Sequence, residues 1–422
     1  MMKYILFIMI AIAFMQCGKK TTEPPASTSS INTAHLDGLY EEIKMEGDTV
    51  GIIHIYAEAP EYRWKGDDDE GVACVDDVAR AAIFYLRQYK VTADPEHLRK
   101  GRMLMKFILA MQAPNGYYYN FIWPDGTIHK DGVTSKPEPN WWSWRAFWAF
   151  GEALAVIDPN DKLEPSIRHQ REVMAKNILN EKSFASTETD TAMGITIPTW
   201  LPKACGTDQA SIVMIGLSMM LQQYTTRDVI SKDTITAFIR HFAEGIYMMQ
   251  IEQPDSLKDG AFLSWENLWH AYGNNQSYAL LTAGQVIDDP HMESHALYEI
   301  DHFYPSILKA GGMDHFWVKV VDGKMIRYDT KQFPQIAYGR SPMVWAAVKA
   351  YEITEDHKYL KMAKELGEWF SGQNPAKMPM FDPATGRGYD GINGADQVNK
   401  NAGAESTIES LLSMQALEKY KK

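Results

Sequence analysis

Six apolar segments recur along this chain at an almost constant spacing, each preceded by a short polar stretch. The first is GVACVDDVARAAIFYLRQY and the last is NAGAESTIESLLSMQAL. One position near the start of each segment marks the period: Asp76, Ser143, Asp208, Asn274, Gly339 and Ala404. The intervals of 67, 65, 66, 65 and 65 residues are too regular for six unrelated elements. We therefore expect six copies of one structural unit.

Each repeated segment is apolar or small on nearly every face, which is typical of a helix buried on all sides. Between the segments lie helical patterns with one polar face, which predict partly exposed helices. These five amphipathic patterns cover residues 94–112, 163–179, 235–250, 291–310 and 356–372. Residues 32–45 are expected to supply a sixth outer helix that packs beside the last inner one.

Buried and amphipathic helices that alternate through short links form helical hairpins. Six hairpins closed into a ring give an all-α fold, the (α/α)6 toroid, as a single domain over residues 32–422. An open solenoid would show the same alternation. We favour closure because neither the first nor the last unit carries the polar capping face that a solenoid needs.

In such a ring the N-termini of all inner helices lie on one face, so the polar stretches converge there. A concave site lined by convergent polar groups is the default ligand site. Two long segments that lead into inner helices, residues 114–140 and 374–402, are expected on this face. A small β-hairpin insertion is expected near residues 316–329, because Asp322-Gly323 is a turn signal.

The first seventeen residues differ from the rest. Lys3 precedes a short apolar run that ends just before Cys17, as in a bacterial lipoprotein signal peptide cleaved and lipidated at that cysteine. Gln16 is not the small residue usual at this position, so a plain secretory signal and an uncleaved anchor stay as alternatives. Residues 18–31 are rich in Ser, Thr and Pro and are expected to be a flexible tether. The prediction is an exported protein attached to a membrane by a lipid.

Charge and cysteine content exclude several classes. The net charge is −12 and no basic stripe occurs, which disfavours nucleic-acid binding. Cys74 and Cys205 could pair in an export compartment, but two separate buried thiols are favoured. No Cys/His cluster indicates zinc, and neither a metal nor a cofactor is expected.

Several segments resemble a known superfamily. DTVGIIHIY, GVACVDDVARA, GNNQSYAL and NAGAESTIESLL are similar to the six-hairpin glycosidase-like superfamily, especially to helical-toroid domains appended to some bacterial glycosyltransferases. The resemblance covers about residues 48–418. It implies the toroid fold, and a superfamily that contains hydrolases, lyases and epimerases. Those appended domains carry a DDNARA-like stretch, which the aspartates and the arginine of DDVARA match at Asp76, Asp77 and Arg80.

Glycoside hydrolysis generally needs two carboxyl groups. Our catalytic candidates on the convergent face are Asp76, Asp77, Glu266 and Glu405. We expect one aspartate to cap its helix and the other to face the cleft, with Arg80 pairing to them and lowering a carboxylate pKa. For Glu405 the structural alternative is a capping box.

Aromatic faces stack on sugar rings, while amides and charged groups bind hydroxyls. Our substrate-binding candidates of these types are Trp142, Trp144, Arg145, Asp208, Trp269, His270, Tyr272, Asn274, Asn275, Gln276, Arg340 and Asp390. For each of them the alternative is a structural role, as a core side chain, a satisfied amide or a helix cap.

The sequence thus favours a carbohydrate-active protein whose partner is an oligo- or polysaccharide, most simply a glycoside hydrolase. A polysaccharide lyase or epimerase would instead use His270 and Tyr272 as base and acid, and a lyase would use Arg340 or Arg145 to hold a uronate. A non-catalytic glycan-binding surface lipoprotein would have the same cleft without a competent pair of acids.

Overall fold

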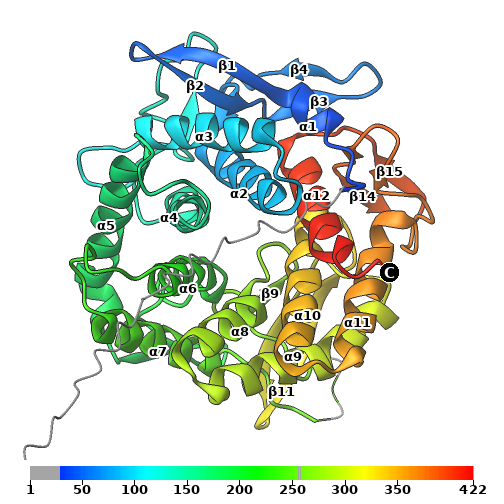
Figure 1. The fold of residues 1–422 in the computed structure, drawn as a ribbon. Helices are drawn as coiled ribbons and strands as arrows, with labels where there is room; N and C mark the ends of the chain where they lie inside the picture. The colour runs from blue at the N-terminus through cyan, green and yellow to red at the C-terminus, as the bar shows by residue number, and fades with distance from the viewer. Residues whose placement is uncertain (1–28, 255, 257, 422) are drawn as a thin grey trace, which may run out of the picture.

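The computed structural model describes residues 29–254, 256 and 258–421 (Figure 1). The predicted signal peptide (1–17), Cys17 and residues 18–28 of the predicted tether lie outside the described residues. Ser29 and Ser30 already contact the folded body, because both donate hydrogen bonds to the carboxylate of Glu418, at 2.7 and 2.8 Å from their hydroxyls.

The described chain alternates between inner and outer helices. The inner helices are α2 (Val75–Thr92), α4 (Trp141–Leu154), α6 (Thr207–Gln222), α8 (Gln276–Ile287), α10 (Ser341–Thr354) and α12 (Ala404–Glu418). The outer helices are α1 (Ala34–Leu39), α3 (Pro95–Ala110), α5 (Glu164–Asn180), α7 (Lys232–Met248), α9 (Pro290–Lys309) and α11 (His357–Gly367). Three short 3-10 helices cover Lys182–Ala185, Ala337–Gly339 and Glu368–Ser371.

The inner helices form a closed ring. Each packs against the next in sequence, and α12 packs against both α10 and α2 (Figure 1). The inner helices are buried on all sides, as their sequences predict: every residue from Thr207 to Met220 of α6 is buried. The expected all-α (α/α)6 toroid is confirmed, and the open solenoid is excluded by the contact between α12 and α2.

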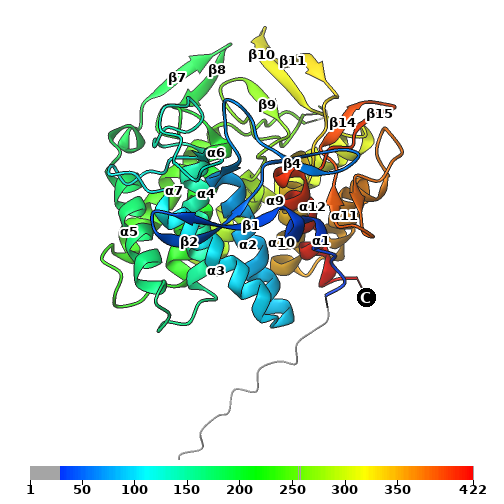
Figure 2. The same cartoon turned by 90° about the horizontal axis from the view of Figure 1, so that it is seen from above.

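Small strands decorate one end of the barrel. They are β3 (Tyr56–Glu58), β4 (Arg63–Lys65), β5 (Ala73–Cys74), β6 (Phe121–Ile122), β7 (Thr189–Ala192), β8 (Ile195–Pro198), β9 (Leu268–His270), β10 (His315–Val321), β11 (Lys324–Lys331), β12 (Phe381–Asp382), β13 (Arg387–Gly388), β14 (Gly391–Gly394) and β15 (Gln397–Asn399). Figure 2 shows the β7–β8 and β10–β11 hairpins standing at the end opposite the described C-terminus. The predicted hairpin near 316–329 is confirmed as β10–β11, and β7–β8 was not anticipated.

The expected sixth outer helix over residues 32–45 is correct only in its first half. Helix α1 ends at Leu39 and packs against α12, but the next residues form β1 (Tyr40–Met45), which pairs with β2 (Asp48–Ile53). Glu46 and Gly47 both have positive φ, at 50° and 89°, which suits a two-residue hairpin turn. Strand β2 then packs against α3, so a hairpin occupies the place expected for helix.

Cys74 and Cys205 are buried and unpaired, so the favoured alternative of two separate thiols is correct. Among the described residues, none of the helices has both the length and the apolar character needed to cross a membrane.

Close contact between inner helices predicts that Gly216→Ala destabilises the fold. A methyl group at this position of α6 would overlap the ring of Phe147 on α4. We expect a loss of about 1–3 kcal/mol in the free energy of unfolding, measured by urea denaturation. Gly38→Ala in α1 is the matched control, because nothing lies within 4 Å of the added methyl group. It should leave stability unchanged or raise it by up to about 1 kcal/mol. Equal stability of both variants would contradict the close packing.

Candidate functional site

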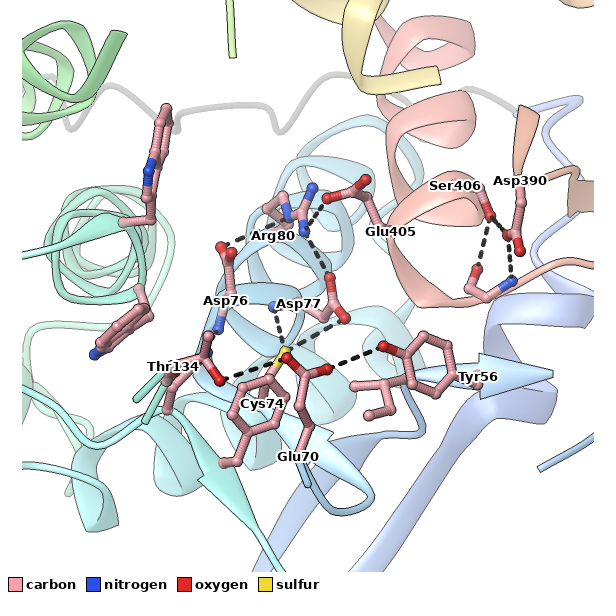
Figure 3. Close-up of a pocket in the computed structure, with 16 residues that line it drawn as sticks. Tyr56, Glu70, Cys74, Asp76, Asp77, Arg80, Thr134, Asp390, Glu405 and Ser406 are labelled. Carbon is pink, nitrogen blue, oxygen red and sulfur yellow. Dashed lines mark hydrogen bonds and ion pairs between the residues drawn. The ribbon is translucent and has the colours of Figure 1, made fainter. Parts of the chain in front are cut away.

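A cavity of about 440 Å³ opens at the N-terminal ends of α2, α4 and α12. Five carboxyl residues line it: Glu70, Asp76, Asp77, Asp390 and Glu405 (Figure 3). Residues of both long segments, 114–140 and 374–402, contribute to its wall, as the sequence predicts. Because the inner-helix N-termini meet here, backbone N–H groups and helix dipoles stabilise this concentration of negative charge.

Arg80 lies beside three of these acids, Asp76, Asp77 and Glu405 (Figure 3). Its side chain is buried, and one nitrogen, Nη2, donates to Asp77 Oδ1 at 2.6 Å and to Glu405 Oε2 at 3.1 Å. Its other terminal nitrogen donates to Glu409 Oε1 at 3.0 Å, a carboxylate that is fully buried inside α12. Arg80 thus connects α2 to α12.

A second arginine completes the cluster. Arg145 of α4 forms an ion pair with Asp76, and its guanidinium lies 4.7 Å from the centre of the Tyr338 ring. Arg80 lies 5.3 Å from the same ring. Both buried guanidinium groups therefore contact the Tyr338 ring and interact favourably with its π-electrons.

The charges in this cluster do not balance if every acid is ionised, since four carboxyl groups (Asp76, Asp77, Glu405 and Glu409) surround two guanidinium groups. Burial raises the pKa of Asp77 to about 6; Arg80 opposes the shift, while Asp76 and Glu405 add to it. Burial also raises the pKa of Glu409. The lowered pKa expected for a paired aspartate is wrong for Asp77, because desolvation outweighs the arginine.

Neither aspartate caps α2, contrary to expectation. The N-cap is Cys74, whose sulfur accepts a hydrogen bond from the Asp77 backbone N–H at 3.4 Å. Asp76 and Asp77 are both free to line the cavity. The side chains of Asp77, Asp76 and Glu405 are 9%, 23% and 44% exposed, so Glu405 is the most accessible of the three.

The cavity also contains polar and aromatic walls. Asp390 accepts hydrogen bonds from the Ser406 hydroxyl at 2.8 Å and the Gly403 N–H at 3.1 Å, and burial raises its pKa. Tyr56 also lines the cavity and donates to Glu70 at 3.0 Å. Trp142 lines the cavity as predicted.

A second cavity of about 350 Å³ lies beside the first, on the same end of the barrel. Asp208, His270 and Tyr272 line it, as three of the predicted binding residues. His270 Nε2 lies 3.1 Å from Asp208 Oδ2, and Nδ1 lies 2.7 Å from the Tyr272 carbonyl oxygen. Both ring nitrogens of His270 therefore face acceptors. The Tyr272 ring stacks on His270 with 3.7 Å between centroids.

Several predicted residues lie elsewhere. Glu266 lines neither cavity; it occupies a left-handed turn, with its N–H donated to Cys205. A sugar contact is wrong for Trp144 and Trp269, because both are completely buried. Trp144 donates to Gln209, and Trp269 stacks on Phe316.

The predicted amides and Arg340 are also internal. Asn274, Asn275, Gln276 and Arg340 are all buried and line neither cavity. Gln276 donates to Thr207, and Arg340 donates to Gln335 at 3.4 Å. These positions precede or begin inner helices, but their side chains are buried within the protein and do not line the cleft.

The site residues predicted from the sequence did not include Glu409 or Trp141. Glu409 follows Glu405 by four residues and so lies on the same helix face, a spacing that could have identified it. Trp141 lines both cavities. Across residues 29–254, 256 and 258–421, no group of three or more His, Cys, Asp or Glu side chains is arranged to hold a metal ion.

The raised pKa of Asp77 predicts an altered pH dependence of stability in Asp77→Asn. Unfolded aspartate ionises near 3.8 and folded Asp77 near 6, so between these values the folded state holds a proton that the unfolded state has lost. Raising the pH through this window therefore destabilises the wild type through Asp77 but not the variant. We expect the urea midpoint of the variant, measured at pH 4, 5, 6 and 7, to increase relative to that of the wild type as the pH rises to about 6. A constant difference between the wild type and Asp77→Asn at all four pH values would contradict the raised pKa of Asp77.

No protein-family model and no curated protein matches the sequence. Solved structures do match. A cellobiose 2-epimerase from Bacillus thermoamylovorans has a TM-score of 0.60 at 12% identity, covering 92% of this chain and 96% of that one. A D-mannose isomerase has 0.61 at 13%, covering 92% and 95%. An alpha-1,2-mannosidase from Trichoderma reesei has 0.54 at 13%, covering 83% and 77%. The chain therefore has the (α/α)6 toroid fold of these sugar epimerase, isomerase and mannosidase structures.

Proposed function

We propose that this chain is a carbohydrate-active enzyme that hydrolyses glycosidic bonds in the acidic cavity. The observation that carries the proposal is the pair of Asp77 and Glu405. Asp77 has a pKa raised to about 6, so it holds a proton in mildly acidic solution, while Glu405 is accessible in the same cavity. An acid whose environment keeps it protonated next to a second carboxylate is the arrangement that glycoside hydrolysis requires.

In this mechanism Asp77 protonates the leaving oxygen and Glu405 attacks the anomeric carbon. Water, deprotonated by Asp77, then releases the sugar from Glu405. The shared Arg80 nitrogen limits the gap between Asp77 Oδ1 and Glu405 Oε2 to 5.7 Å, the sum of the two bond lengths. This limit supports retention, for which the carboxyl groups are about 5–5.5 Å apart, over inversion at about 6.5–9.5 Å. Asp76, held by Arg145, is positioned to bind a sugar hydroxyl.

Asp77→Asn and Glu405→Gln should each lower kcat by about 100-fold or more on an oligosaccharide that the wild type cleaves. The wild-type rate should fall as the pH rises above about 6, where Asp77 loses its proton. Release of new reducing ends measures the rate, and NMR of the first product identifies its anomer. Glu61→Gln, on an exposed turn, is the matched control. Full activity of both site variants would overturn the assignment.

Epimerisation or isomerisation of a sugar is the second candidate. It is supported by the epimerase and isomerase structures, which this chain covers almost completely, and by His270 in the second cavity. Against it, both ring nitrogens of His270 are already engaged by Asp208 and a carbonyl. A changed sugar without a new reducing end would identify this reaction.

A lyase acting on uronates fits less well. Arg145 is already paired with Asp76, and Arg340 is buried away from both cavities. A cavity lined by five carboxyl residues would also repel an anionic sugar.

We further propose that the protein is exported and anchored through a lipid on Cys17, on the basis of the N-terminal sequence. In a bacterial host, Cys17→Ser should move the protein from the membrane fraction to the soluble fraction. Glu61→Gln should stay with the membrane. A wild-type protein found entirely in the soluble fraction would contradict the anchor.

A further inference from the structure

The second cavity shares one wall with the acidic cavity, and that wall is Trp141. Trp141 is the first residue of α4 and is half-buried. Its ring lies against the Arg145 guanidinium, 5.6 Å from the ring centre, and Arg145 in turn holds Asp76. The wall between the two cavities is thus fixed to the acid cluster.

The second cavity presents two aromatic side chains to solvent, Trp265 and Tyr272, which are 37% and 43% exposed. Both are held in place. The Trp265 indole donates to the Lys203 carbonyl at 3.1 Å, and Tyr272 stacks on the buried His270. Exposed aromatic rings that are fixed within a concave site have little conformational entropy to lose when a ligand stacks on them.

Gln209 gives an independent sign of a ligand. It lines this cavity and is only 6% exposed. Its carbonyl oxygen accepts from Trp144, but its amide nitrogen has no hydrogen-bond partner among the described residues. This nitrogen is accessible from the cavity, so it can donate a hydrogen bond to a ligand acceptor there, such as a sugar hydroxyl.

We infer that the second cavity is a sugar subsite, so that the substrate is a neutral oligosaccharide of at least two units that spans Trp141. One unit binds among the acids, and the next stacks on Trp265 or Tyr272 and accepts from Gln209. This inference rests on the proposed function for the chemistry in the first cavity, but it concerns binding and is tested by binding.

The experiment measures affinity by calorimetry with two series of probes. They are mannose with its α-1,2-linked dimer to tetramer, and glucose with its β-1,4-linked dimer to tetramer. Glu405→Gln serves as the background, to prevent cleavage. In at least one series, affinity should rise by about tenfold or more between one and three units. Trp265→Ala and Tyr272→Ala should remove most of that gain and leave binding of the single sugar unchanged.

Trp64→Ala is the matched control. Trp64 is 47% exposed, donates to a carbonyl and stacks on a histidine, but it lines neither cavity. This variant should bind all probes like the background protein. The subsite is overturned if no probe binds, if affinity does not depend on length, or if the two site variants match Trp64→Ala. Length-dependent binding without cleavage by the wild type would overturn the hydrolase and leave the subsite standing. If the wild type cleaves oligosaccharides at a rate that depends neither on their length nor on Trp265→Ala, the subsite is overturned and the hydrolase stands.

Discussion

The ion pairs of Arg80 lie where the ring closes. Arg80 belongs to the first inner helix, and its partners Glu405 and Glu409 belong to the last. A buried guanidinium requires partners for its charge and its donors, so α12 must dock against α2 in one register. Arg80 and Glu405, with Asp77, also line the acidic cavity. Closure of the ring and the arrangement of the site therefore depend on the same ion pairs.

This double role sets the electrostatics. A buried ion pair stabilises a protein only when its members are mutually satisfied. Here the acids outnumber the arginines. Burial raises the pKa values of both Asp77 and Glu409, and at Asp77 the neighbouring acids Asp76 and Glu405 add to the shift. Protonation of Asp77 then offsets part of the excess negative charge. An acid that holds its proton in mildly acidic solution is thus a by-product of how the ring is sealed. The proton on Asp77 therefore affects both the stability of the fold and the proposed catalysis.

The repeat period predicted the ring and the proximity of Asp76, Asp77 and Glu405. The inner and outer layers were also predictable, because the inner segments are apolar or small on nearly every face. Side-chain direction at the helix starts was not predictable in this way. Trp142 and Trp144 lie two residues apart in α4, yet only Trp142 lines the cavity, because packing buries Trp144 completely. The N-cap of α2 is Cys74 and not an aspartate. The direction of the pKa shift of Asp77 depends on desolvation, and burial of this side chain could not be predicted from the sequence. Residues 40–45 became a strand because their partner, β2, lies across a tight turn.

The β7–β8 and β10–β11 hairpins come from different units of the ring, yet they touch: the Val320 N–H donates to the Met193 carbonyl at 2.9 Å, and Gly194 lies against the Val320 side chain. Neither hairpin belongs to an inner helix. Over evolutionary time, such insertions can change length and sequence without disturbing the barrel. Because the two hairpins contact each other, a change in the length or sequence of one should be matched by a change in the other. The hairpins should therefore vary together among related proteins while the helices stay the same.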